Sequence, residues 1–161
     1  MDDVNSVSAR LLRSTILTGL SDGLFSSVLV VFFYGSTATR LFQYVASTLL
    51  GQSAFDGGMP VALFGLLIHF SVAFGWSAVF LLILSRAGWV RALLYSRFGV
   101  VKVAAIYGPC VWLMMSLVII PLITHHGLPA LTYRWWIQLV GHFPFVGIPI
   151  VWSIGKETVS S

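Results

Sequence analysis

Four long apolar runs, separated by polar connections, dominate the chain. They cover residues 14–34, 61–84, 103–123 and 134–154. Each run reaches the roughly 20 residues that a helix needs to cross a hydrocarbon core about 30 Å thick. The pattern predicts an all-α fold, an integral membrane four-helix bundle that occupies residues 1–161 as one domain.

The longest connection, residues 36–60, has a pattern of its own. Its apolar positions approach helical spacing at Leu41, Phe42, Val45, Leu49 and Leu50. This spacing predicts a short amphipathic helix lying in the membrane interface. We interpret the segment as an interfacial spacer between the first two spans, and a lid or gate is the alternative.

Composition supports a membrane protein. Hydrophobic residues make up 58% of the chain and charged residues 9%. So little polar surface does not suffice to cover a water-soluble globule of 161 residues. The lipid bilayer is therefore the expected surroundings of most of the chain.

Basic residues flank the four runs unevenly. One side of the predicted bundle holds Arg10, Arg13, Arg86, Arg91, Arg97, Lys102 and Lys156. The other side holds only Arg40 and Arg134. Because cytoplasmic loops are enriched in Lys and Arg, both termini and the middle connection are expected in the cytoplasm. The net charge of +4 then reflects topology and attraction to anionic headgroups, and no nucleic-acid partner is expected.

The first run is expected to remain in the protein. Arg10 and Arg13 followed by an apolar stretch and the small residues 35–38 resemble a signal peptide with its processing site. The stretch is longer than an ordinary signal sequence, however, and it contains Asp22. Its removal would also leave three spans and disturb the consistent charge pattern.

The two halves of the chain show a weak internal likeness. His69-Phe70 in the second run is followed by Phe74-Gly75, and His142-Phe143 in the fourth run is followed by Val146-Gly147. Each pair lies on the second helix of a predicted hairpin. This likeness suggests two parallel hairpin repeats related by an axis along the membrane normal, with chance similarity as the alternative.

Small residues and prolines predict where the helices touch and bend. Gly19 and Gly23 form a Gly-x-x-x-Gly step, and the second run offers a small face at Ser71, Gly75 and Ala78. The third and fourth runs contain Pro109, Pro144 and Pro149. Each proline removes a backbone donor, so bent helices and freed carbonyls in need of a partner are expected.

Three ionisable side chains lie at membrane depth: Asp22, His69 and His142. Each lies about eight residues inside its run, so all three fall within roughly 6–8 Å of one another in depth. A charged carboxylate at mid-membrane costs about 2.5–3.5 kcal/mol even on the lenient insertion scale. Asp22 should therefore face the bundle interior, be paired or be protonated, and the three residues are candidates for one polar cluster.

Three interpretations of this cluster stay open. In the first, Asp22 accepts a hydrogen bond from a histidine, Ser21, Ser26 or Tyr107 as an interhelical clasp. In the second, the acid and the imidazoles form a proton or ion path. In the third, the two histidines are axial ligands of a b-type haem.

Motifs for enzymatic catalysis are missing. The sequence contains no P-loop, no Gly-x-Gly-x-x-Gly, no His-Glu-x-x-His and no nucleophile elbow. Beyond the termini, Asp22 and Asp56 are its only acids, which restricts acid-base catalysis. The single cysteine, Cys110, allows no internal disulfide and no cysteine metal motif, and His125 with His126 makes a weak external metal site. The chain is expected to be no enzyme and to need no cofactor.

Short segments of all four runs carry a resemblance. They are Gly65 to Phe70 and Trp76 to Ala78 in the second run, Gly19 to Asp22 in the first, Tyr107-Gly108 and Met115 to Leu122 in the third, and Gly147 to Ile150 in the fourth. With them, the chain from Ser14 to Trp152 resembles a group of small four-span bacterial membrane proteins of unknown function. The resemblance implies a bacterial inner-membrane location and four helices, and it implies no activity.

Taken together, the sequence predicts a non-enzymatic membrane module or accessory subunit with a buried Asp/His cluster. A small transporter or proton-linked carrier is the alternative. Four spans enclose little volume, so transport would require a homo-oligomer or a larger membrane complex.

Overall fold

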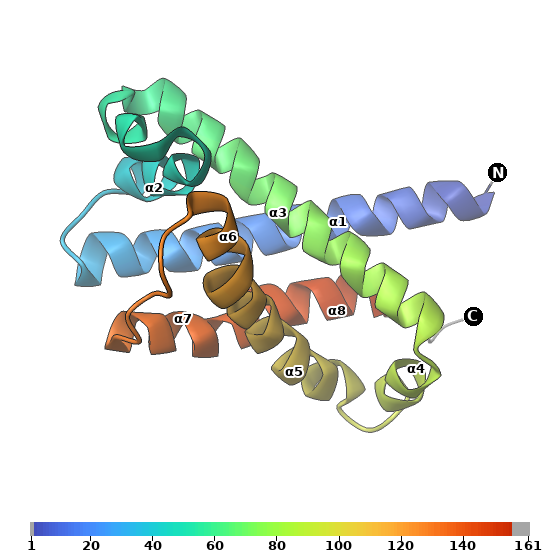
Figure 1. Cartoon of the computed structure of the whole chain (residues 1–161). Coiled ribbons are helices and arrows are strands. Elements are labelled where there is room, and N and C mark those ends of the chain that lie inside the picture. Colours follow the sequence, from blue (N-terminus) through green and yellow to red (C-terminus); the bar gives the residue numbers. More distant parts are fainter. Residues whose placement is uncertain (1, 156–161) are drawn as a thin grey trace.

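The computed structural model describes residues 2–155, and their side chains from residue 7 onward. Helices make up nearly all of this part, which contains no strand. In chain order (Figure 1) they are α1 (Asp2–Val28), η1 (Leu29–Phe33), α2 (Ala38–Leu50), η2 (Gly51–Asp56), α3 (Gly58–Arg86), α4 (Gly88–Leu94), α5 (Gly99–Met114), η3 (Met115–Ile119), α6 (Ile120–Thr124), α7 (Tyr133–His142), η4 (Phe143–Gly147) and α8 (Ile148–Gly155). The all-α prediction is confirmed.

Four continuous helical stretches are long and apolar enough to cross a membrane. They are Val7–Phe33, Gly58–Arg86, Gly99–Thr124 and Tyr133–Gly155. Each contains nearly all of one of the four predicted runs, so the prediction of four spans is confirmed. Large apolar side chains cover their outer faces, as at Leu24, which is 65% exposed. Such a surface suits lipid rather than water.

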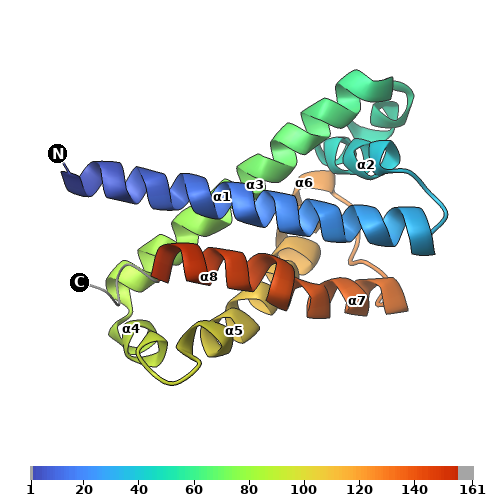
Figure 2. The same ribbon diagram turned by 180° about the vertical axis from the view of Figure 1, so that it is seen from behind.

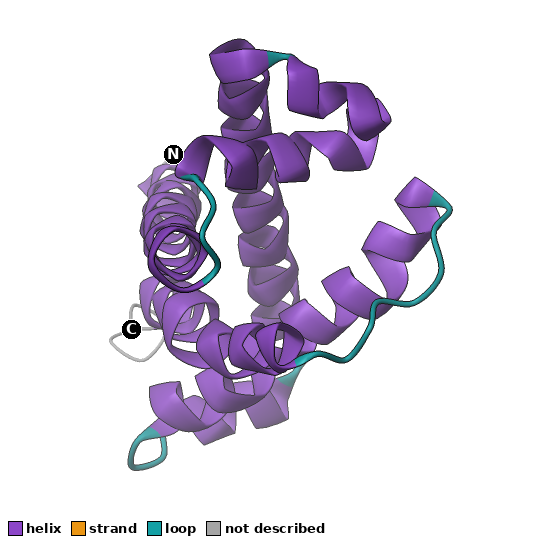
Figure 3. Cartoon of the chain, turned by 90° about the vertical axis from the view of Figure 1, so that its left-hand side faces the viewer, coloured by secondary structure: helices purple, strands orange, loops and turns teal. Residues whose placement is uncertain are grey.

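The four stretches run alternately in opposite directions (Figures 1 and 2). At one end of the bundle lie the two ends of the described chain and α4; at the other end lie α2, α6 and the connection that leads to α7. α1 packs against α3 on one side and against α8 on the other. In the end-on view of Figure 3, α5 and α6 are steeply tilted, and α6 contacts α2.

Two of the three connections between the spans contain helices. Residues 36–60 form α2 and the 3₁₀ helix η2, which confirms the predicted helix there. The hydroxyl of Thr37 caps α2 by accepting from the Arg40 N–H at 3.1 Å. The middle connection, between the second and third spans, contains α4, and the Arg91 guanidinium donates to the carbonyl of Leu84 at 2.6 Å. That bond satisfies a carbonyl at the end of α3, where helices lack internal partners.

The core lies toward the α4 end of the bundle. Its buried side chains come from α3, α4, α5, η4 and α8, and they include Phe80, Leu94, Tyr107, Ile150 and Ile154. The rings of Phe80 and Tyr107 lie 4.9 Å apart. In lipid the hydrophobic effect does not drive this packing, so van der Waals contact must stabilise it.

Glycines allow the closest approaches between helices. A Cβ at Gly65 would overlap the carbonyl of Phe42 in α2, and one at Gly108 would overlap the carbonyl of His142. The expected small face of the second span was placed wrongly, because Ser71 is exposed and nothing lies within 4 Å of a Cβ at Gly75. The buried small residues of α3 are Ala62, Gly65, Ala73 and Ser77, spaced three, eight and four residues apart along one helical face.

Two of the three π-helical turns among residues 2–155 precede a proline, and the third, η1, does not. η3 begins six residues before Pro121 (115 to 121), and η4 begins six residues before Pro149 (143 to 149). A proline has no N–H and its ring pushes away the carbonyl four residues earlier, so the preceding turn widens. α5 continues as an α-helix through Pro109, where irregular geometry was expected.

One freed carbonyl finds its partner on another helix. Pro149 cannot donate to the carbonyl of Phe145, four residues earlier, and the Ser21 hydroxyl of α1 donates to that oxygen at 2.5 Å. The same hydroxyl also lies 3.2 Å from the Thr18 carbonyl of its own helix. The contact links α1 to η4 and meets the need for satisfied backbone groups in lipid.

Other polar contacts join neighbouring helices along the bundle. The buried hydroxyls of Ser14 and Ser77 lie 2.7 Å apart, and because Ser77 donates to the Ala73 carbonyl, Ser14 is the donor of this pair. The Arg13 guanidinium donates to the Ser153 carbonyl of α8 at 2.6 Å. Each such bond contributes about 0.6 kcal/mol on average in a membrane bundle, so several are needed to define the arrangement.

Replacing Gly65 by Ala should destabilise the bundle by roughly 1–3 kcal/mol, because the added methyl group overlaps the Phe42 backbone. The loss should appear as a lower midpoint of thermal unfolding in detergent, followed by circular dichroism. Gly75→Ala in the same helix is the matched control, since its Cβ meets no atom within 4 Å. Equal midpoints for the two variants would contradict this packing.

Candidate functional site

Asp22 faces the interior of the bundle. Along α1, Gly19 and Gly23 contact His69 and Phe70 of α3, while Ser21 contacts η4. At 3.6 residues per turn, Asp22 lies on the arc between these two faces. The opposite side of α1 carries exposed leucines, among them Leu24. The carboxylate is therefore directed between α3 and η4, as its cost in lipid requires.

His69 lies against the glycine step of α1. Its Nε2 is 3.0 Å from the Gly19 carbonyl, and since a carbonyl only accepts, Nε2 carries the proton and donates. A Cβ at Gly23 would lie 3.4 Å from the same nitrogen. The rings of Phe42 and Phe70 meet His69 edge-on at 5.9 and 5.8 Å. Because Nε2 carries the proton, the Nδ1 atom of the neutral His69 imidazole is a hydrogen-bond acceptor.

His142 is buried on the fourth span, with 7% of its surface exposed. Its Nδ1 donates to the Gln138 carbonyl one turn earlier, at 2.7 Å. The ring packs on Trp112 of α5 with centroids 4.8 Å apart. Both Asp22 and His69 lie close enough to His142 to act on it electrostatically. The Nε2 of His142 is thus the ring atom free to take up or release a proton.

Several buried polar atoms around these residues have no hydrogen-bond partner within residues 7–155. Those in this region are Asp22 Oδ1, Thr18 Oγ1, Gln138 Oε1 and Trp112 Nε1. Thr18 lies one turn before Asp22 on the same face, and Gln138 reaches α1 by donating to Ser26 Oγ at 3.4 Å. Leaving such a group unpaired costs about 1–3 kcal/mol, so each of these atoms calls for an explanation. We call Asp22, His69, His142, Gln138 and Thr18 the polar centre.

The groups expected to clasp Asp22 bond elsewhere. Ser21 donates to backbone carbonyls, Ser26 accepts from Gln138, and the Tyr107 hydroxyl donates to the Trp76 carbonyl at 2.6 Å. Tyr107 belongs to the core at the α4 end. No donor in the described part of the chain reaches Oδ1 of Asp22.

α2 covers the polar centre from the side of the first connection. Phe42 contacts His69 through its ring and Gly65 through its backbone, and it approaches Gly23 as well. The Gln43 amide holds the end of the connection by donating to the Gly58 carbonyl at 3.1 Å. The segment 36–60 is therefore packed onto the second span beside His69.

Gln138, Thr18 and Trp112 were not among the candidates drawn from the sequence. A usable signal exists for two of them: Gln138 precedes His142 by four residues, and Thr18 precedes Asp22 by four. A polar residue one helical turn from an ionisable one shares its face. Trp112 gives no such signal, because tryptophan in an apolar run is ordinary.

The polar centre does not resemble a metal or haem site. Among the described residues, no three His, Cys, Asp or Glu side chains come close enough together to hold a metal ion. A haem between His69 and His142 would need an open flat slot, whereas Phe42 and Phe70 pack against one ring and Trp112 against the other. The arrangement does not fit the haem interpretation.

No protein-family model matches this chain, and searches for similar proteins found none among curated sequences and none among solved structures. The resemblance to small four-span bacterial proteins therefore rests on the quoted residues alone.

Replacing Ser21 by Ala should lower the stability of the bundle by about 1 kcal/mol, because the Phe145 carbonyl loses its donor from α1. Thermal unfolding in detergent measures the loss. Ser71→Ala is the matched control, since that exposed hydroxyl bonds only the Leu67 carbonyl of its own helix. If Ser71→Ala lowered the stability as much as Ser21→Ala, the hydrogen bond between α1 and η4 would make no special contribution to the stability of the bundle.

Proposed function

We propose that the chain is a small, non-enzymatic membrane protein that carries protons through the polar centre. The supporting observation is the carboxylate of Asp22, which is directed into the bundle with Oδ1 unpaired and with two imidazoles nearby. Intramembrane ionisable groups of this kind commonly mark proton relays.

The geometry favours this proposal over a structural clasp. A clasp would show donors on the carboxylate, because an ion pair or hydrogen bond is what offsets its burial. Instead, the Ser21 hydroxyl donates to the Phe145 carbonyl, Ser26 accepts from Gln138, and neither hydroxyl reaches Oδ1 of Asp22. A carboxylate that exchanges a proton with a neighbouring imidazole alternates between a neutral and a charged pair, and it needs no permanent donor.

Each histidine keeps one nitrogen for proton exchange. His69 uses its Nε2 proton on the Gly19 carbonyl, and His142 uses its Nδ1 proton on the Gln138 carbonyl. These bonds hold the tautomers, so Nδ1 of His69 and Nε2 of His142 are the atoms that receive a proton. Asp22 lies on the arc of α1 between the two helices that carry these histidines. In this proposal a proton passes between the two imidazoles through its carboxylate.

Asp22→Asn should abolish proton flux, because the amide cannot release a proton at any accessible pH. The measurement is acidification of vesicles that contain the purified protein and a pH-sensitive dye, driven by a potassium diffusion potential. Asp56→Asn is the matched control: it is the same chemical change at an exposed acid outside the spans, and full flux is expected.

Two results would contradict the proton-carrier proposal. One is unchanged flux in Asp22→Asn with a lowered unfolding midpoint, which would identify Asp22 as a structural group. The other is the absence of flux above that of empty vesicles in the wild type, which would favour the accessory-subunit interpretation.

We further propose that the protein resides in a bacterial inner membrane with both termini in the cytoplasm, working as a homo-oligomer or in a larger complex. The bundle end with α4 carries Arg86, Arg91, Arg97 and Lys102, while Arg40 and Arg134 lie at the other end. Clustered Lys and Arg favour retention of that end in the cytoplasm.

Alkaline phosphatase fused after Gly127 should be active, and the same enzyme fused after Ser161 should be inactive, because it folds only outside the cytoplasm. Gly127 is suitable for fusion because it is exposed and lies in the connection between α6 and α7. Fluorescence of a green fluorescent protein at the same two sites gives the opposite readout. Activity after Ser161 would reverse the proposed orientation.

A further inference from the structure

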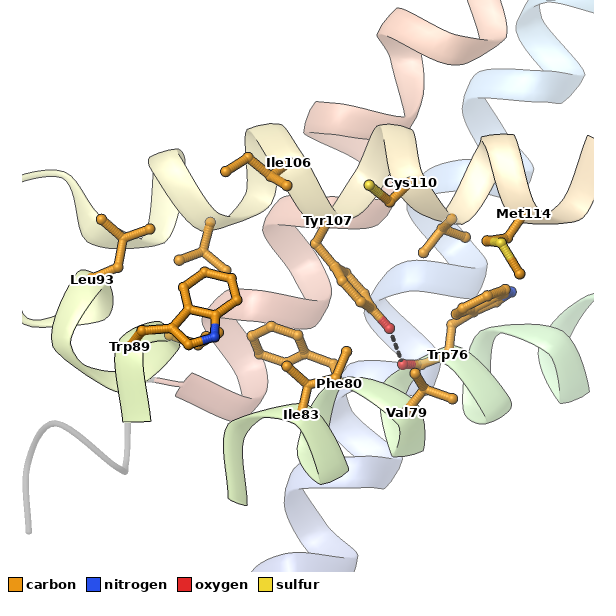
Figure 4. A pocket seen from close by; sticks show the side chains of 13 residues that line it. Trp76, Val79, Phe80, Ile83, Trp89, Leu93, Ile106, Tyr107, Cys110 and Met114 are labelled. Carbon is orange, nitrogen blue, oxygen red and sulfur yellow. Dashed lines mark hydrogen bonds between the residues drawn. The ribbon is translucent and has the colours of Figure 1, made fainter. Parts of the chain in front are cut away.

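An apolar cavity of about 310 Å³ opens on the outside of the bundle between α3, α4 and α5, away from the polar centre. Figure 4 shows its walls: Trp76 and Val79 on α3, Trp89 on α4, and Ile106 and Met114 on α5. The exposed surface of the cavity is entirely apolar. The one hydroxyl in the wall, on Tyr107, is already bonded to the Trp76 carbonyl. Water would find no polar partner there.

The two helical walls of the cavity each end in a basic residue. On α5, Lys102 begins a stripe that continues at four-residue spacing through Ile106, Cys110 and Met114. On α3, the wall residue Ile83 is followed three residues later by Arg86. Lys102 and Arg86 are exposed and lie at the same end of the bundle, because α3 and α5 run in opposite directions.

The cavity has the length of one membrane leaflet. On α5 its wall extends from Val103 to Met114, which at 1.5 Å per residue spans roughly 16 Å. Half of a hydrocarbon core about 30 Å thick is nearly the same length. Trp89, 68% exposed at the basic end, matches the tryptophans that lie at headgroup level in membrane proteins.

We propose that this cavity binds an acyl chain of an anionic phospholipid from the leaflet on the α4 side, with the headgroup phosphate held by Arg86 and Lys102. Negative charge suits this end of α3 and α5, because residues 57–155 place Arg86, Arg91, Arg97 and Lys102 there and contain no Asp or Glu. A second copy of the chain is disfavoured as the occupant, since its own basic end would lie at the same depth. An anionic lipid supplies both the apolar chain and the negative charge.

The test is native mass spectrometry of the full chain released from micelles containing equal parts of phosphatidylglycerol and phosphatidylcholine. The wild type should retain phosphatidylglycerol preferentially. Arg86→Gln with Lys102→Gln should lower the retained phosphatidylglycerol about tenfold or more, because each basic residue near an anionic surface contributes roughly a factor of five. Arg40→Gln with Arg97→Gln removes the same charge away from both stripes and should retain the lipid.

A second variant separates the cavity from the charge. Val79→Trp fills the apolar space and leaves both basic residues in place, so it should also lose the lipid. Labelling of Cys110, the one cysteine of the chain and a wall residue, reports occupancy: a maleimide should react several-fold more slowly in the lipid-loaded wild type than in the Arg86 and Lys102 double variant.

Three results would overturn the proposal. The first is equal retention of the two lipids by the wild type, and the second is equal loss in both charge variants. The third is a Val79→Trp protein that keeps its lipid while its dimer fraction falls, because the cavity would then be an interface between copies.

Discussion

Inside a bilayer no water is available to a polar group. A backbone carbonyl or a buried polar side chain therefore depends on the bundle itself for a hydrogen-bond partner. The contact between Ser21 and Phe145 shows this constraint at work. Pro149 deprives the Phe145 carbonyl of its usual donor, and a hydroxyl from the first helix replaces it. The irregular geometry of the fourth span and the polar composition of the first therefore depend on each other.

The same constraint divides the bundle into two parts. Toward α4, apolar side chains such as Phe80 and Ile150 form the core, beside which the Tyr107 hydroxyl is paired and the buried Ser153 hydroxyl has no partner among residues 7–155. Toward α2, Asp22, Thr18 and Gln138 keep unpaired atoms at its interior. Phe25 and Phe145 stack 4.4 Å apart between α1 and η4, next to Ser21.

The membrane enters this structure in two ways. It is the solvent of the outer helix faces, where large apolar side chains are exposed along all four spans. In our proposal it is also a ligand, since the cavity between α3 and α5 combines an apolar wall with cationic ends at Arg86 and Lys102. The cavity lies on α3, α4 and α5 and the polar centre on α1, α3 and α7, so the two share only α3 and have no residue in common. Lipid binding and proton movement can therefore be tested independently.

The sequence by itself determined the all-α class, the four spans, the helix between the first two spans and the inward direction expected of Asp22. These features follow from hydropathy, helical periodicity and the cost of charge in lipid, which are local properties of the chain. Tertiary structure alone decided which small residues are buried, since Gly65 and Gly75 look alike until a neighbour is placed beside one of them. It also decided that Ser21 and Tyr107 donate to carbonyls of neighbouring helices and that Ser26 accepts from Gln138. The surroundings of His142, with Gln138 one turn away and Trp112 against its ring, were decided in the same way. A hydrogen bond between helices depends on their relative rotation and depth to within an ångström, and no local pattern encodes that distance.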